Sequence, residues 1–129
     1  MRRIARTAAV AAGAAAAAFA ARWLAHAGPP LRRFAVEGDS MLPAFRAGDR
    51  VLVWAWAYRS RPPAPGDVVL LRDPERAGRV LIKRVAAPPQ GAPPGHVYVV
   101  GDNEPMSRDS RQFGVLPLST VIGRVLWRY

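Results

Sequence analysis

The residues that most often supply a nucleophile or a base, cysteine and histidine, are scarce in this chain. The 129 residues contain no cysteine and only two histidines, His26 and His96. This composition excludes thiolate nucleophiles, disulfides and cysteine-based metal sites, and it leaves little material for a histidine-based triad. We therefore expect neither a metal ion nor a cofactor.

Lysine use is more informative than the total charge. The chain has eighteen arginines but a single lysine, Lys83. Arginine stays protonated in proteins, whereas a buried lysine can lose its proton and act as a base. A lone lysine in such a chain indicates a position where arginine fails chemically, although chance explains the count equally well.

The net charge of +10 raises nucleic acid as a partner. The arginines are scattered through every segment, however, and no aromatic-interleaved basic stripe or known nucleic-acid motif accompanies them. We therefore predict no nucleic-acid partner. A basic surface can still rest against anionic lipid headgroups.

Three short patterns carry residues suited to nucleophilic catalysis. A serine hydroxyl is a poor nucleophile until a neighbouring base accepts its proton, and Ser-Lys pairs substitute for Ser-His-Asp triads. Lys83 can be that base only if apolar surroundings lower its pKa by several units. Its neighbours Leu81, Ile82 and Val85 supply such surroundings. The patterns are GDSMLP at 38–43, LIKRV at 81–85 and GDNEPMSRDSRQFG at 101–114.

These patterns resemble the type I signal peptidases of bacteria and their mitochondrial inner-membrane relatives, the S26-type Ser/Lys peptidases. The resemblance runs from about Phe34 to the C-terminus, and the last box keeps its spacing unbroken over fourteen residues. A fourth family element, PGDVV, stands at 65–69. The S-M-x-P box matches at Ser40, Met41 and Pro43, the K-R-V box at Lys83, Arg84 and Val85, and the G-D-N-x-x-x-S-x-D-S-R-x-x-G box across 101–114.

The resemblance implies a role for each matched residue. Ser40 is the implied nucleophile, Lys83 its general base, and Ser107 the residue that orients the lysine amine. Asp109 and Arg111 form an implied ion pair that shapes the active-site wall. The Ser40 backbone N–H would stabilise the oxyanion. Supporting roles fall to Ser110 in the same loop, to Gly38, Asp39, Met41 and Pro43 around the nucleophile, and to Gly101, Asp102 and Asn103 in the motif turn.

Without the resemblance, each of these residues has an ordinary structural interpretation. Ser40 would be a turn serine, Lys83 an exposed strand charge, and Asp109 with Arg111 a surface salt bridge. The chain also departs from the family at three positions. Gly38 stands where some members add a serine hydroxyl to the oxyanion hole, Ala44 replaces a common threonine, and Met106 replaces a common asparagine.

The segment between Lys83 and Gly101 is short, so the large extra β-domain of many bacterial members is missing. The chain is therefore similar to the minimal members of the family. These include the mitochondrial proteases and the small proteases proposed to mature nickel superoxide dismutase.

Residues 1–27 combine N-terminal arginines with an alanine run over 7–21, which predicts a helix. Its uncharged stretch spans about 22 Å, against about 30 Å for a hydrocarbon core, so it crosses a bilayer only if Arg6 and Arg22 snorkel. We expect a membrane anchor. A cleaved signal peptide ending at Ala25-His26-Ala27 and a soluble alanine-rich helix are the alternatives.

After Gly28 the sequence changes to short β-rich runs separated by Pro and Gly. We expect a mainly β protein, with a compact antiparallel, barrel-like peptidase domain over 28–129 behind one N-terminal helix. The second predicted strand alternates, with Leu52, Trp54, Trp56 and Tyr58 on one face. That face is either a core face or a membrane-interface face. Predicted strands are 34–37, 50–58, 67–72, 80–87, 97–100 and 121–127.

The sequence thus predicts a membrane-anchored serine endopeptidase that removes N-terminal signal or leader peptides after small residues. Its expected partners are precursors with extended Ala-x-Ala-like segments and membrane lipid. We expect one membrane pass, with the catalytic domain on the extracytoplasmic face of the cell membrane. The alternatives are a protease dedicated to one precursor, such as a superoxide dismutase propeptide, a non-catalytic membrane-associated module, and a soluble self-cleaving repressor, which lacks the last box.

Overall fold

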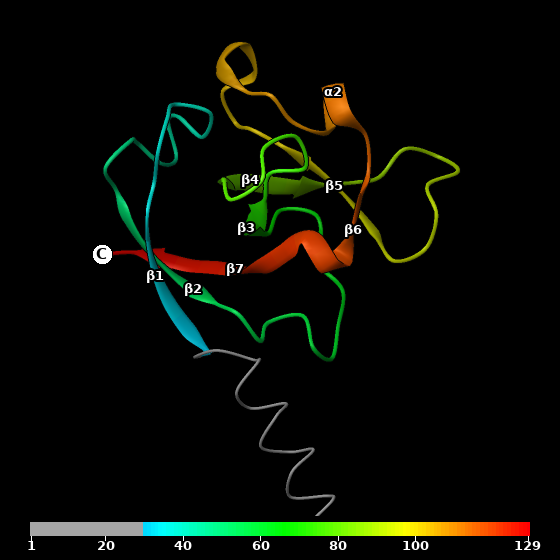
Figure 1. Ribbon diagram of the computed structural model, residues 1–129, viewed down its shortest axis with the longest axis horizontal. Helices are drawn as coiled ribbons and strands as arrows, with labels where there is room; N and C mark the ends of the chain where they lie inside the picture. The colour runs from blue at the N-terminus through cyan, green and yellow to red at the C-terminus, as the bar shows by residue number, and fades with distance from the viewer. Residues whose placement is uncertain (1–29) are drawn as a thin grey trace, which may run out of the picture. The chain divides into compact units, whose positions relative to one another are not determined.

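Short β-strands dominate residues 30–129, the part of the chain that the computed structural model describes (Figure 1). The predicted N-terminal helix over 1–27 lies outside the described residues. The strands are β1 (Leu31–Ala35), β2 (Arg50–Trp54), β3 (Val68–Arg72), β4 (Val80–Ala86), β5 (His96–Val100), β6 (Leu116–Pro117) and β7 (Val121–Arg128). One helical turn, α2 (Ser110–Phe113), and two 3₁₀ turns, η1 (Glu104–Met106) and η2 (Leu118–Thr120), complete the elements.

The strands form one seven-stranded sheet in the order β1-β2-β7-β3-β4-β5-β6, and every pairing is antiparallel. The sheet curls into a half-barrel (Figure 1). The C-terminal strand β7 joins β1 and β2 to strands β3 to β6, because it pairs with β2 on one side and with β3 on the other. The expectation of a mainly β, antiparallel fold is confirmed.

The second predicted strand is wrong beyond Trp54, where β2 ends. The chain turns there instead, because the Ala57 N–H donates to the Trp54 carbonyl and the Arg59 N–H to the Trp56 carbonyl. Tyr58 donates its hydroxyl hydrogen to Asp67, 2.9 Å away. Alternation within the true strand is as predicted, since Val51 and Val53 are buried and Leu52 and Trp54 are more exposed.

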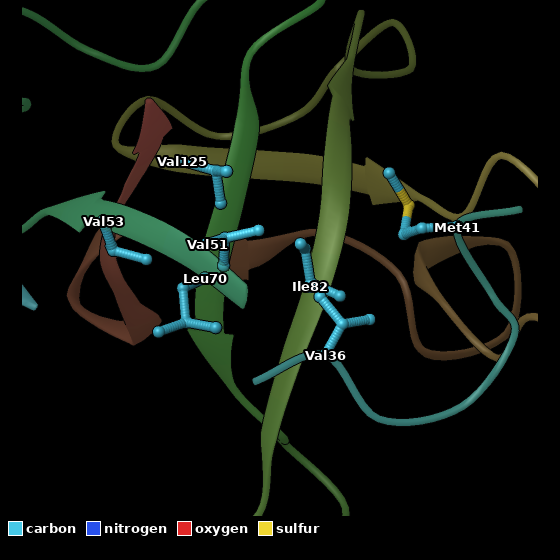
Figure 2. Packing of buried hydrophobic residues seen from close by; sticks show 7 residues of the cluster. All are labelled: Val36, Met41, Val51, Val53, Leu70, Ile82 and Val125. Atoms are coloured by element: carbon cyan, nitrogen blue, oxygen red, sulfur yellow. The ribbon is translucent and has the colours of Figure 1, made fainter. Parts of the chain in front are cut away.

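Two hydrophobic clusters pack on opposite faces of β3 and β4. Alternation along β4 places Ile82 in the first cluster, and Leu81 and Val85 in the second. Figure 2 shows the first cluster, which Met41 joins from the loop that carries Ser40. Its buried members are Val36, Met41, Val51, Val53, Leu70, Ile82 and Val125, and those of the second are Val69, Leu71, Val85, Val97, Val99 and Leu116.

None of the helical segments described between residues 30 and 129 is long and apolar enough to cross a membrane.

Candidate active site

The loop that carries Ser40 is fixed from two sides. Met41, only 1% exposed, anchors it in the first core cluster, and the Met41 carbonyl accepts the Phe45 N–H at 2.9 Å. From the last sequence motif, the Asn103 N–H donates to the Ser40 carbonyl at 2.8 Å. The Asn103 side chain donates to the Asp39 carbonyl at 3.0 Å. These contacts leave the half-buried Ser40 side chain at the edge of a groove.

Lys83 is buried on β4, with 3% of its surface exposed, and its amine donates to Ser107 Oγ at 3.0 Å. Burial lowers its pKa below the ordinary lysine value. The Asp109 carboxylate opposes this shift, whereas the positive charges of Arg79 and Arg111 add to it. The amine therefore loses its proton more readily than a free lysine does.

The apolar surroundings of Lys83 differ in part from those expected. Leu81 and Val85 lie on the same face of β4 as Lys83 and pack in or against the second cluster. Ile82 points to the other face and packs in the first cluster, so it does not flank the amine. The 101–114 segment provides the remaining cover through Ser107.

Asp109 organises the residues around the amine. Its fully buried carboxylate accepts hydrogen bonds from Ser107 Oγ at 2.6 Å and from the Gly101 N–H at 2.8 Å. Arg111 donates to both carboxylate oxygens, at 3.0 and 2.7 Å. Burial by itself would raise the pKa of Asp109, but the hydrogen bonds from Arg111, Gly101 and Ser107 hold it well below the usual range.

This ionised carboxylate determines how Ser107 can act. Because the Ser107 hydroxyl gives its hydrogen to Asp109, its oxygen is left to accept a hydrogen from Lys83. A neutral amine held in this way keeps its lone pair for another partner. The chain Asp109–Ser107–Lys83 therefore holds the Lys83 amine in a defined position.

The local sequence explains why Asp109 sits where it does. Asp109 caps the one-turn helix α2, where its side chain accepts from the Arg111 N–H, and the Gln112 side chain accepts the Asp109 N–H in return. Gly114, with φ of 79°, ends the turn. The buried Ser110 hydroxyl accepts the Val99 N–H at 2.9 Å and so ties the turn to β5.

Residues 101–103 connect the parts of the site. A Cβ on Gly101 would collide with the Ser107 side chain and lie 2.7 Å from the Ser40 carbonyl oxygen, so this close approach requires glycine. Asp102 accepts two hydrogen bonds from Arg84, at 2.8 and 2.9 Å. Since Arg84 follows Lys83 on β4, this ion pair ties β4 to residues 101–103, and Asn103 in turn donates to the Ser40 carbonyl.

A groove of about 390 Å³ brings Gly38, Asp39, Ser40 and Lys83 together. No hydrogen bond joins the Ser40 and Lys83 side chains among the interactions of residues 30–129, and catalytic contacts are often long before substrate binds. Apolar side chains line the groove at Phe34, Val80, Leu81, Ile82, Met106 and Phe113, and charged ones at Glu37, Asp73, Glu75, Arg76, Arg79 and Arg108.

Some contacts at the groove were not foreseen from the sequence. Arg108 pairs with Glu75 of the β3–β4 turn, with a shortest contact of 2.5 Å, and thereby links that turn to the last motif. The positive charge of Arg79 helps to lower the pKa of Lys83. The motifs gave no indication of a role for Arg108 or Arg79, because the contacts of both residues depend on how the β3–β4 turn folds beside the groove. Within residues 30–129, no cluster of three His, Cys, Asp or Glu side chains could hold a metal ion.

Comparison with known proteins gives the same assignment as the motifs. A family model for signal peptidase, peptidase S26, matches residues 2–92 and 89–129. The chain is 36% identical over 110 residues to mitochondrial ATP-independent inner membrane protease subunit 1b of Arabidopsis thaliana, covering 70% of this chain and 65% of that protein. It is 31% identical over 134 residues to the probable signal peptidase I-1 of Synechocystis sp., covering 73% and 68%.

A third relative, mitochondrial inner membrane protease subunit 2 of Schizosaccharomyces pombe, is 36% identical over 111 residues, covering 70% of this chain and 60% of that protein. The chain thus spans 60% to 68% of the length of these relatives. The family model covers the chain from residue 2 to residue 129, so the chain belongs to the signal peptidase family, peptidase S26.

Proposed function

We propose that this protein is a membrane-anchored serine endopeptidase that removes N-terminal signal or leader segments from exported precursors, cutting after small residues. Ser40 is the nucleophile and Lys83 the general base. The observation that carries this proposal is the buried lysine amine, hydrogen-bonded to Ser107 and facing the same groove as Ser40. A buried amine with a lowered pKa serves poorly as a surface charge but well as a base.

In the proposed reaction, the neutral Lys83 amine takes the Ser40 hydroxyl proton while Oγ attacks the scissile carbonyl carbon. The tetrahedral oxyanion faces the Ser40 N–H. Collapse breaks the C–N bond, and the Lys83 ammonium returns its proton to the leaving amine. Water then attacks the acyl-enzyme, Lys83 takes a proton from it, and Ser40 is released with its hydrogen restored.

The oxyanion hole of this chain must rely on backbone donors near Ser40. Gly38 has no side chain to donate, and its φ of 74° suits glycine. A serine at this position would adopt that φ at a cost. We therefore include Gly38, Asp39, Met41 and Pro43 as residues that shape the hole rather than as side-chain donors.

We assign residues 1–27 as the anchor and residues 28–129 as the protease domain, with one membrane pass and the domain on the extracytoplasmic face. The alanine run flanked by arginines supports the anchor. Full-length protein should remain in the membrane fraction at high salt. Release into the supernatant would reject the anchor without touching the catalytic assignment.

The direct test incubates purified full-length protein with a precursor that carries an Ala-x-Ala segment and sequences the N-terminus of the product. We expect one cut after the second alanine with the wild type and with Ser119→Ala, an exposed serine away from the groove, but no cut with Ser40→Ala. Cleavage by folded Ser40→Ala would reject the nucleophile. N-terminal sequencing of proteins from a deletion strain would show whether the substrates are many or one.

A further inference from the structure

An ion pair beside the groove connects the two segments that carry Lys83 and Ser107. Arg108 donates to both carboxylate oxygens of Glu75, at 2.5 and 2.7 Å. Glu75 belongs to the turn 73–79, which leads from β3 into the strand of Lys83, and Arg108 directly follows Ser107 in the chain. The contact is bidentate, and such contacts fix the orientation of both partners as well as their separation.

Two ion pairs lie on either side of the hydrogen bond between the lysine amine and Ser107 along the chain. One joins Arg84, the residue after the lysine, to Asp102 near the start of the last motif. The other joins Glu75, in the turn before β4, to Arg108, the residue after the serine. Because the two pairs join the same two segments at different points, together they restrain both sliding and rotation of one segment against the other.

The segment around Arg108 has few other restraints. Ser107 and Asp109 are extended, with φ of −120° and −152°, so their side chains point to one side and the Arg108 side chain points to the other. Among the hydrogen bonds within residues 30–129, none joins the Arg108 backbone to another backbone group. The contact with Glu75 is therefore the main restraint on this residue.

The turn that carries Glu75 is held by several contacts. The Asp73 N–H donates to the Arg79 carbonyl at 2.9 Å, and the Asp73 carboxylate accepts the Glu75 N–H at 2.8 Å. Asp73 and Arg79 also form an ion pair at 3.8 Å. The hydrogen bonds from Arg108 lower the pKa of Glu75, so this carboxylate is ionised at neutral pH. The turn thus presents a fixed negative charge to Arg108.

We propose that the Glu75–Arg108 ion pair positions the general base. It holds Ser107 against the Lys83 amine, so Glu75 and Arg108 are positioning residues for the reaction. This step rests on the proposed function, in which Lys83 is the base. Exposed ion pairs contribute little to stability, so the effect should appear in the rate rather than in the fold. A displacement of about 1 Å can cost about 100-fold in rate, and because Asp109 still holds the serine we expect a loss of about tenfold in kcat.

A direct effect of the two charges on the lysine is the alternative, and it predicts a different pattern. By charge alone, Glu75→Gln would lower the pKa of Lys83 and Arg108→Gln would raise it. If the pair holds the cover over the amine, both variants admit water and both raise that pKa toward the free value. Neither residue is among the charged groups that shift the lysine pKa most, which are Asp109, Arg79, Arg111 and Asp73.

The test uses the full-length protein and four variants of the ion pair. They are Glu75→Gln, Arg108→Gln, the double glutamine variant, and the swapped variant Glu75→Arg, Arg108→Glu. The control is Asp49→Asn with Arg128→Gln, which removes an exposed ion pair outside the groove. For each protein, kcat and KM are measured with an Ala-x-Ala peptide. The pKa of Lys83, the single lysine, is measured without substrate from its Cε resonance in protein labelled with ¹³C-lysine.

We expect each glutamine variant to lose about tenfold in kcat at unchanged KM, and the double variant to lose no more than either single one, since the two residues act as one unit. All three should raise the pKa of Lys83. The swapped variant should recover most of the rate, and the control should match the wild type. Unchanged kcat in the glutamine variants would overturn the proposal. So would opposite pKa shifts in the two single variants, or a KM that follows the charge of the peptide.

Failure here can be told apart from failure of the proposed function. Raised lysine pKa values in a protein whose wild type cleaves no peptide would reject the proposed function and still support positioning of the amine. Normal cleavage by all variants, with one common pKa, would reject the positioning alone. Circular dichroism checks each fold. If a single variant unfolds, comparison of the double and swapped variants still decides, because only the swapped protein can form the pair.

Discussion

Replacing Lys83 with arginine should abolish activity while leaving the fold in place. The substitution keeps the positive charge and most of the aliphatic stem, but the guanidinium does not deprotonate. If Lys83 were only an ion-pair partner or a surface charge, arginine would serve as well as it does at the eighteen positions where the chain already uses it.

The size of the effect follows from the role of a base. General base catalysis typically contributes about 10²- to 10⁴-fold in rate, or roughly 3 to 5 kcal/mol of transition-state free energy at about 1.4 kcal/mol per factor of ten. We therefore expect a loss of at least about 100-fold in kcat for Lys83→Arg.

Two companion variants separate the base from the charge. Lys83→Met removes the charge and keeps a long stem, so it should be as inactive as Lys83→Arg if the amine is the base. In a chain without other cysteines, Lys83→Cys can be alkylated at one site with bromoethylamine, which rebuilds an amine and should restore cleavage. The assay is single-turnover cleavage of an Ala-x-Ala peptide, with Arg72→Lys as an exposed control on β3.

A folded Lys83→Arg protein that cleaves the peptide at near the wild-type rate would refute this reasoning. So would alkylated Lys83→Cys protein that stays inactive although circular dichroism shows the native fold. In the wild type, kcat/KM should rise with pH as the amine deprotonates, with an apparent pKa below the free value of about 10.4.

Three further predictions test the surroundings of the amine. Ser107→Ala should lower kcat by about 10- to 100-fold without changing KM, because hydrogen bonds to charged groups contribute about 1.5 to 3 kcal/mol; unchanged kcat would reject the orienting role. Asp109→Asn should destabilise the fold by about 1 to 3 kcal/mol in thermal denaturation, since the buried carboxylate accepts hydrogen bonds from Arg111, Gly101 and Ser107 that an amide makes less well, whereas Asp49→Asn at an exposed pair should do little. The pKa of Asp109 is lowered in the folded protein, so the contribution of the ionised carboxylate to the free energy of unfolding is complete above about pH 4 and is lost as the pH falls further. If Asp109→Asn lost stability over the same pH range, this role of Asp109 would be contradicted. Gly101→Ala should lower kcat of the folded protein. Gly123→Ala is the control, because its Cβ would meet the Trp54 carbonyl oxygen at 2.6 Å, and it should lower only the melting temperature. Equal kcat in the two variants would count against the close approach at Gly101.

The sequence supported the fold class and the grouping of motif residues because both depend on local signals. Alternation and turn residues predict short strands, and the GDN…S-x-D-S-R box encodes a capped turn that places Asp109 beside Ser107. Strand ends were harder to predict. The alternation from Val51 to Tyr58 continues past Trp54, but turn hydrogen bonds and the Tyr58–Asp67 contact end the strand there.

Long-range contacts could not be predicted from one sequence. Arg84 and Asp102 stand eighteen residues apart, and Glu75 and Arg108 thirty-three apart, so only the folded sheet shows that they pair. The order β2-β7-β3 is of the same kind, since nothing local indicates that the last strand inserts between earlier ones. Alternation along the predicted strand 80–87 already puts Leu81 and Val85 on the same face as Lys83, but only the fold shows that this face packs in the second cluster.

The central claim is that Lys83 is a base, and the chain allows its protonation to be measured directly. Because Lys83 is the single lysine, protein labelled with ¹³C-lysine gives one Cε resonance, and a pH titration of that resonance reports one pKa. We predict a pKa well below the free value of about 10.4, equal to the apparent pKa of kcat/KM. Titration of Lys83 near the free value, or at a pKa unrelated to the activity profile, would contradict the mechanism.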